Sequence, residues 1–269
     1  MRRILLILSG MATPRRAAWA VAGLVLAVGL AGCKDATEPM PETGIDYYPV
    51  AVGNFRVYAV ADSTWNQATM TAPSTVVASS YQFKETITEI FTDAAGQKAY
   101  RVVRSKLLPP ATAWRDDSVF VLSATAQSVV LNRNNTRTVE LVFPVREGRS
   151  WNFNAYNNNF NDTITAETRR YSRVGQPFAT GGGATGLPVA SYPVTLTTTN
   201  TGVASENTLV KTLSYQQVFA KGVGPVFRRR LYFLPYTYTN QATGNQIYPA
   251  NSYFSGFSRR ETLIDYGPR

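Results

Sequence analysis

Histidine is absent from the 269 residues of this chain, and cysteine occurs only once, as Cys33. Ser-His-Asp and Cys-His catalysis both require a histidine as general base, and the common zinc sites are built from several histidine and cysteine ligands. The composition therefore excludes these sites. We expect no metal, no cofactor and no enzymatic activity.

Acidic residues are also few, 17 against 27 lysines and arginines. The candidate carboxylate pairs are Asp116 with Asp117, and Glu85 with Glu89, which would lie about 13 Å apart on one strand face. A glycosidase needs two carboxyl groups that approach each other from different strands, and no pattern predicts such a pair. We interpret these acids as solvated and keep a carboxylate-dependent envelope hydrolase only as the last alternative.

Long helical patterns are missing after residue 46. Residues 81–91 alternate between apolar and polar side chains, residues 93–96 turn and residues 99–103 return, which is typical of a β-hairpin. Further strands are predicted at 118–122, 128–131, 139–143, 163–174, 227–233 and 257–266, with an asparagine-rich loop at 152–161. The chain therefore predicts an all-β domain, either an antiparallel, strongly curved sheet or a partly open barrel, preceded by a cleaved signal helix.

One apolar run stands out near the N-terminus. Residues 17–30 follow Arg15 and Arg16 and are too short for a membrane span, which needs about 20 apolar residues, but they fit the core of a secretory signal peptide. The run ends in Leu30, Ala31, Gly32 and Cys33. These four residues resemble the lipobox of bacterial lipoproteins.

That resemblance implies that residues 1–32 are a signal peptide, whether translation begins at Met1 or Met11, and that Cys33 carries lipid. In lipoproteins the cysteine thiol takes a diacylglyceryl group and the new amine is acylated, for example with palmitate. One fatty chain binds a membrane only marginally, whereas two or three hold it firmly, at about 0.8 kcal/mol per buried methylene. The predicted partner is thus the membrane, through the N-terminal lipid on Cys33.

The residues after Cys33 predict a tether and a location. Residues 33–45 are polar and contain prolines, which indicates a flexible linker, and the β domain is predicted at 46–269. Lys34, in place of an aspartate, argues by analogy with lipoproteins against retention in the inner membrane. We expect a lipid-anchored protein of the cell envelope, in the periplasmic or the surface-facing leaflet of the outer membrane.

Removal of residues 1–32 takes away four arginines and no acid, so the net charge falls from +10 to +6. A basic surface can indicate nucleic-acid binding, but an exported protein meets no nucleic acid in its normal work. We attribute the charge to solubility, or to anionic lipid or polysaccharide nearby.

A second resemblance appears where the β domain begins. The residues are Tyr48, Pro49, Val50, Gly53, Asn54 and Phe55. They resemble the opening "YPVxVGN" segment of uncharacterised lipoproteins of diderm bacteria, which often have tryptophan at the position of Arg56. The pattern returns 95 residues later, in Phe143, Pro144, Val145, Gly148 and Phe153. This spacing predicts either two related halves, 46–142 and 143–269, or two similar corners of one sheet.

A third signature lies near the C-terminus. Residues 220–224 read AKGVG and resemble a segment near the end of the same lipoproteins, with Pro225 where those proteins usually have leucine. Two glycines two residues apart permit the positive backbone angles of a tight hairpin turn. The activity of that family is itself unknown.

A dinucleotide fingerprint is matched by chance. Gly181, Gly183 and Gly186 satisfy GxGxxG, but this motif requires a helix to begin at its last glycine. Leu187 and Pro188 follow instead, and Pro188 is badly placed for such a helix. We interpret the segment as a flexible loop.

Two clusters are candidate binding surfaces. Arg228, Arg229 and Arg230, with Arg259 and Arg260, are basic, but alternation places Arg229 on the face opposite its neighbours, which favours a solvated edge. The aromatic set is Tyr232, Phe233, Tyr236, Tyr238, Tyr248, Tyr253 and Phe254. It suits apolar ligands or sugar faces, or ordinary cross-strand pairs. The candidate ligand surface is Tyr232, Tyr236, Tyr238, Arg228 and Arg230.

We therefore expect a noncatalytic, lipid-anchored envelope protein that presents its β domain to an envelope glycan, lipid or protein. The alternative is a carrier whose concave half-barrel shelters an acyl chain or another hydrophobic ligand, an idea that depends on fold analogy alone. The observation that bears most on this choice is whether the sheet encloses a cavity.

Overall fold

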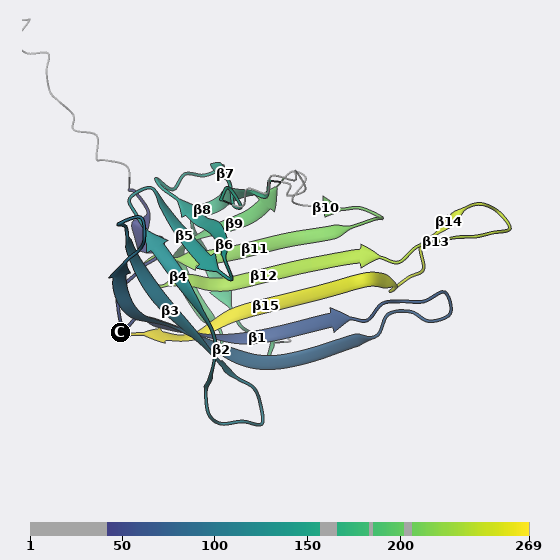
Figure 1. The fold of residues 1–269 in the computed structure, drawn as a ribbon, viewed down its shortest axis with the longest axis horizontal. Coiled ribbons are helices and arrows are strands. Elements are labelled where there is room, and N and C mark those ends of the chain that lie inside the picture. Colours follow the sequence, from purple (N-terminus) through teal and green to yellow (C-terminus); the bar gives the residue numbers. More distant parts are fainter. Residues whose placement is uncertain (1–41, 157–165, 183–184, 202–205, 269) are drawn as a thin grey trace, which may run out of the picture. The chain divides into compact units, whose positions relative to one another are not determined.

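A computed structural model describes residues 42–156, 166–182, 185–201 and 206–268 (Figure 1). Leu30, Ala31, Gly32 and Cys33 of the predicted lipobox, the rest of the signal peptide and the first part of the tether lie outside the described residues. So does part of the asparagine-rich loop. Residues Glu42–Arg269 form one compact unit.

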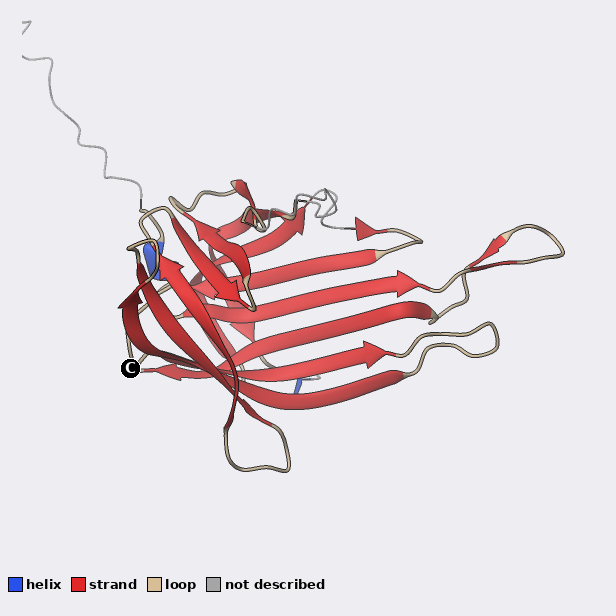
Figure 2. Ribbon diagram, viewed as in Figure 1, coloured by secondary structure: helices blue, strands red, loops and turns tan. Residues whose placement is uncertain are grey.

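Nearly all the regular secondary structure of the compact unit is β-strand, joined by loops and turns (Figure 2). The first six are β1 (Phe55–Trp65), β2 (Val76–Thr92), β3 (Lys98–Leu107), β4 (Arg115–Ala124), β5 (Ser128–Arg133) and β6 (Thr136–Val142). Six further strands continue the main sheet: β7 (Ser150–Asn152), β8 (Thr168–Thr180), β9 (Ala190–Thr201), β11 (Thr212–Ala220), β12 (Gly224–Pro235) and β15 (Tyr253–Gly267).

Three short strands and one helical turn complete the fold. β10 (Glu206–Asn207) pairs with β11, and β13 (Tyr238–Thr239) pairs with β14 (Gln246–Ile247) in a separate small hairpin. η1 (Ile45–Tyr47) is a 3-10 turn that precedes β1. No helix in the described ranges has the length and apolar character needed to cross a membrane.

The main sheet runs in the order β6-β5-β4-β3-β2-β1-β15-β12-β11-β9-β8-β7, with every pair antiparallel. The sheet curls into a nearly closed barrel with one open seam. β1 and β15, the first and last strands in the chain, pair in the middle of this order and join two six-stranded meanders. The prediction of an all-β, antiparallel, partly open barrel is confirmed.

The seam separates β6 from β7. It is bridged at one end, where the N–H of Val139 donates to the carbonyl of Phe153 at 2.8 Å and the indole N–H of Trp151 donates to the carbonyl of Val139 at 2.8 Å. The hydroxyl of Tyr171 on β8 both accepts from the N–H and donates to the carbonyl of Val142, each at 2.8 Å. One backbone hydrogen bond and the side chains of Trp151 and Tyr171 therefore take the place of a strand ladder here.

The two YPV-like segments form matching corners, one before β1 and one before β7. In the first, the N–H of Gly53 donates to the carbonyl of Ile87 on β2 at 2.8 Å; in the second, the N–H of Gly148 donates to the carbonyl of Tyr171 on β8 at 3.0 Å. Both glycines have positive φ, 91° and 75°. The corners thus share the glycine contact and the positive φ, but they differ at the proline, because the Phe143–Pro144 peptide bond is cis and the Tyr48–Pro49 bond is not. The relatedness of the complete halves stays a prediction.

An apolar cluster fills one end of the barrel. It includes Tyr47 and Tyr48 from η1 and the residue after it, Phe143 from the second corner, and Leu196 and Phe219 from β9 and β11. Full burial of one such side chain stabilises the fold by roughly 1.5–3 kcal/mol. The N-terminal segment is thereby fixed to the barrel end.

Candidate ligand-binding cavity

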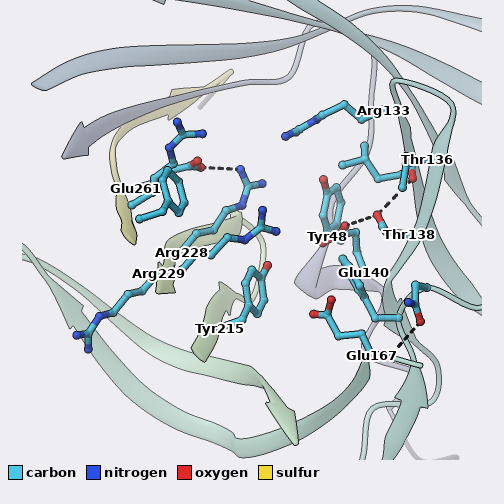
Figure 3. Close-up of a pocket in the computed structure, with 16 residues that line it drawn as sticks. Tyr48, Arg133, Thr136, Thr138, Glu140, Glu167, Tyr215, Arg228, Arg229 and Glu261 are labelled. Carbon is cyan, nitrogen blue, oxygen red and sulfur yellow. Dashed lines mark hydrogen bonds and ion pairs between the residues drawn. The ribbon is translucent and has the colours of Figure 1, made fainter. Parts of the chain in front are cut away.

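A cavity of about 380 Å³ lies inside the barrel. Its walls come from β5 and β6 of the first meander and from β11, β12 and β15 of the second (Figure 3). Tyr48 belongs both to the apolar cluster and to the cavity lining, so the cluster forms the cavity floor. Most of the other lining side chains are charged or aromatic: Arg133, Glu140, Phe153, Glu167, Tyr215, Arg228, Arg229, Arg230, Phe257, Arg259 and Glu261.

An ion-pair network connects four strands beside this cavity. The carboxylate of Glu85 on β2 pairs with Arg104 on β3 and lies 3.2 Å from Nη1 of Arg228 on β12. The same Nη1 atom lies 3.0 Å from Glu261 on β15. Burial by itself raises the pKa of Glu85, but Arg228 and Arg104 outweigh that effect and hold its pKa well below the usual value. Glu85 is therefore ionised.

Arg133, at the end of β5, has no carboxylate partner among the described residues. Its guanidinium lies 4.5 Å from the ring centroid of Phe120, a ring that Arg104 also approaches at 5.3 Å. Its Nε atom is buried without a hydrogen-bond partner in the part of the chain that the structure describes. Burial lowers the pKa of Arg133, and the charge of Arg104 lowers it further.

Two aromatic rings are fixed at another wall of the cavity. The guanidinium of Arg169 on β8 lies 3.3 Å from the ring centroid of Tyr215 and 3.9 Å from that of Phe153, and it pairs with Glu167. The hydroxyl of Tyr215 donates to the side-chain carbonyl of Gln217. Burial raises the pKa of Tyr215 to about 12, so its hydroxyl stays protonated at neutral pH.

The segments singled out by resemblance meet at the base of the barrel. Nε of Arg56 donates to the carbonyl of Val223, and its Nη2 donates to the carbonyl of Pro49, both at 2.9 Å. The same guanidinium lies 5.2 Å from the ring centroid of Tyr48. Arg56 therefore joins the YPVxVGN segment to the AKGVG turn and contacts Tyr48 of the cavity lining.

The structure brings together only part of the predicted ligand surface. Arg228 and Arg230 line the cavity, while the Arg229 side chain extends away from the other labelled residues (Figure 3). Tyr232, Tyr236 and Tyr238 are half-buried and are not part of the cavity lining. Tyr236 packs instead against Tyr238 and Phe254, with ring centroids 6.2 and 4.9 Å away.

The interpretation of the basic cluster as a solvated edge is wrong about the edge, although Arg229 and Arg230 are exposed to solvent. β12 pairs with β11 on one side and β15 on the other, so it is an inner strand of the sheet. Arg259 faces the cavity as well and pairs with Asp62 on β1 at 2.5 Å. Barrel closure turns one face of this strand inward, and its arginines then need carboxylates from neighbouring strands.

The predicted carboxylate pairs are not brought together. Asp116 and Asp117 are exposed on β4, and Glu89 pairs with Arg101 at 3.0 Å at the surface, as expected for solvated acids. Glu85 differs, because it is only 5% exposed and lies in the ion-pair network. Within the described ranges, no group of three or more acidic residues is placed to hold a metal ion.

The glycines of the GxGxxG match belong to the connection between β8 and β9. Gly181 and Gly186 both have positive φ, 78° and 65°, and Gly183 lies outside the described residues. A carbonyl oxygen of Pro188 would lie 2.0 Å from a Cβ added at Gly181. The chain therefore needs glycine here for a close approach of its own backbone.

Several cavity residues were not predicted from the sequence, among them Arg133, Glu140, Glu167, Tyr215 and Glu261. For Arg133 a signal was present, because Val129 and Leu131 alternate with it on β5 and both are buried. A charged residue that continues an inward-facing apolar row is a candidate interior charge. Glu167 gave no such signal, since it precedes β8.

Comparison of the chain with models of known protein families, with curated protein sequences and with solved structures finds no match.

Proposed function

We propose that this chain is a lipid-anchored protein of the cell envelope that binds a ligand in the barrel cavity and does not transform it. The observation that carries this proposal is the cavity itself, whose lining combines arginines, glutamates and aromatic rings. Ligand sites are concave and use a few polar groups to orient their ligand. The lipobox residues Leu30 to Cys33 support the anchor.

The chemistry of the lining also bears on the alternative of an acyl-chain carrier. An acyl chain needs apolar walls, because it cannot satisfy buried charged groups. Arg133, Arg228 and Glu261 face the cavity from opposite walls, and an acyl chain there would strip them of water without a replacement. The lining therefore favours a polar ligand over a hydrophobic one.

A cavity-blocking variant tests the binding function. The full chain is extracted from the membranes of producing cells and denatured, and the released small molecules are identified by mass spectrometry. We expect one molecule per wild-type chain and none from Thr136→Trp, because Thr136 lines the cavity and is exposed enough to accept a ring that covers it.

The control for that experiment is Arg137→Trp, the next residue along β6, which is exposed and is not part of the lining. It should retain the molecule. A folded wild-type chain that releases nothing would contradict the binding function.

The anchor has its own test. Cys33→Ser removes the thiol that takes the diacylglyceryl group, so the protein should leave the membrane fraction and become soluble. Continued presence of Cys33→Ser in the membrane fraction, at the wild-type level, would contradict anchoring through this residue.

A further inference from the structure

Of three arginines beside the cavity, Arg104 and Arg228 form ion pairs and Arg133 forms none within the described residues. The guanidinium groups of Arg104 and Arg228 lie close to that of Arg133, and both positive charges disfavour the charge on Arg133. Glu85 is shared between Arg104 and Arg228, and Glu261 pairs with Arg228. The charges of Glu85 and Glu140 favour the Arg133 cation from a distance, but within the described part of the chain neither carboxylate pairs with it, and its buried Nε has no hydrogen-bond partner.

Arg228 also keeps donors for a ligand. Both of its ion pairs use Nη1, at 3.2 Å from Glu85 and 3.0 Å from Glu261. Its Nε and Nη2 have no ion-pair partner among the residues that the structure describes. In Figure 3, Arg133 reaches into the cavity from β5 toward the side occupied by Arg228 on β12. Two guanidinium groups thus approach one space from opposite walls.

A partly buried cation without an ion-pair partner is costly, and a buried donor without a partner needs an explanation. A bound carboxylate or phosphate would supply both the missing charge and the missing acceptors, because the planar guanidinium fork matches these groups. The pair Arg133 and Arg228 is therefore suited to an anionic group.

The lining on β6, the strand next to that of Arg133, calls for hydroxyl groups. Glu140 accepts a hydrogen bond from Oγ1 of Thr138 at 2.9 Å and has no cationic partner in the described ranges. An ionised carboxylate can only accept hydrogen bonds, so it repels a second anion but binds a hydroxyl. Tyr215 and Phe153 add aromatic rings beside these acceptors. A cavity of this volume falls in the range of small-molecule sites, about 300–1,000 Å³.

We propose that the cavity binds a sugar that carries one acidic group, with the carboxylate or phosphate held between Arg133 and Arg228 and hydroxyls donating to Glu140. The inference rests on the proposed binding function and names the class of ligand. A simple anion lacks the hydroxyls, and a neutral sugar lacks the charge, so neither satisfies both parts of the lining.

The test is isothermal titration calorimetry on the full chain, extracted from membranes in a nonionic detergent. The probes are D-glucuronate, D-glucose 6-phosphate, D-glucose and inorganic phosphate at one ionic strength. Both acidic sugars should bind at least ten-fold more tightly than glucose and than phosphate alone. Their affinity should fall as salt is added, because the charged contact is only partly shielded from solvent.

Variants locate the contact. Arg133→Gln should lower the affinity for the two acidic sugars at least ten-fold and leave the affinity for glucose unchanged. Arg115→Gln, an exposed arginine on β4, should change neither. If Arg133→Gln does not fold, Arg133→Lys serves instead: it keeps the charge but loses the two-pronged geometry, and it should show a smaller loss.

Equal affinity for glucose and glucuronate, or full affinity in a folded Arg133→Gln, would overturn the ligand assignment. If no probe binds although the wild-type chain releases a different molecule on denaturation, the assignment fails and the binding function stands. If no probe binds and nothing is released, both fail.

Discussion

Several charged side chains inside the barrel form ion pairs with residues of other strands. Glu85 is the clearest case, because it serves two arginines on different strands at once. Partners of this kind cannot be identified along one strand of sequence, since pairing depends on which strands become neighbours. This explains why the solvated interpretation of Glu85 was wrong while that of Glu89, four residues away, was adequate.

Removal of the Glu85 charge should therefore lower the stability of the fold strongly. Glu85→Gln leaves Arg104 and Arg228 buried with less compensation, and we expect a loss of about 3–5 kcal/mol in the free energy of unfolding. Glu89→Gln removes a carboxylate from an ion pair that is about half exposed and should cost less than about 1 kcal/mol. Urea denaturation of both variants measures the difference; equal losses would contradict a structural role for the network.

Glu85 should also make the stability of the fold depend on pH. The folded protein holds the pKa of Glu85 below its ordinary value of 4.5, so the unfolded chain binds more protons in acid. The contribution of Glu85 is complete above that ordinary value and is lost as the pH falls below it. Thermal unfolding should show a steeper loss between neutral pH and pH 3 in the wild type than in Glu85→Gln. Parallel curves would contradict the assignment.

At the scale of single elements, the AKGVG turn depends on two glycines with different surroundings. Gly222 has φ of +76° and open space around it, whereas a Cβ on Gly224, φ +100°, would lie 2.6 Å from Nη2 of Arg56. Both positions favour glycine for backbone reasons. Only Gly224 also leaves room for the guanidinium that joins the two family-like segments.

Alanine substitutions separate these effects. Gly222→Ala should cost about 1 kcal/mol of stability through its left-handed backbone. Gly224→Ala should cost about 2 kcal/mol more, because Arg56 must move and lose charge-assisted hydrogen bonds. In an Arg56→Ala background the extra cost should disappear when measured by urea denaturation; if it remains, the contact with Arg56 is not its cause.

Strands with clear alternation could be predicted from the sequence, and those with breaks could not. The predicted segments 81–91 and 257–266 lie within β2 and β15. β9 was missed because Pro193 interrupts its pattern, and the structure places Pro193 where the β8–β9 register skips from Tyr192 to Thr195. A proline can occupy such a gap because no ladder hydrogen bond is required of it.

At the scale of the whole molecule, closure of the barrel determines which side chains line the cavity. The alternation in each strand predicted a curved sheet, but the cavity arises only because β5 and β6 come to face β12 and β15. The position of the seam was likewise not predictable, since it depends on Tyr171 reaching across to Val142. These contacts join segments far apart in the sequence.

Tyr171→Phe tests the bridge across the seam. Loss of the hydroxyl leaves the N–H and carbonyl of Val142 without this partner, so amide hydrogen exchange in β6 should become faster and stability should fall by about 1–3 kcal/mol. Tyr232→Phe, on an inner strand of the sheet, should leave exchange in β6 unchanged. Unaltered exchange in Tyr171→Phe would mean that the bridge does not hold the seam.

Native mass spectrometry of the chain released from membranes in detergent tests the proposed lipid anchor and the proposed cavity ligand in one spectrum. We predict a polypeptide that begins at Cys33, carries acyl chains and holds one small, acidic, sugar-sized molecule. A polypeptide that retains residues 1–32 with a free thiol at Cys33, or a folded chain with nothing bound, would contradict these proposals.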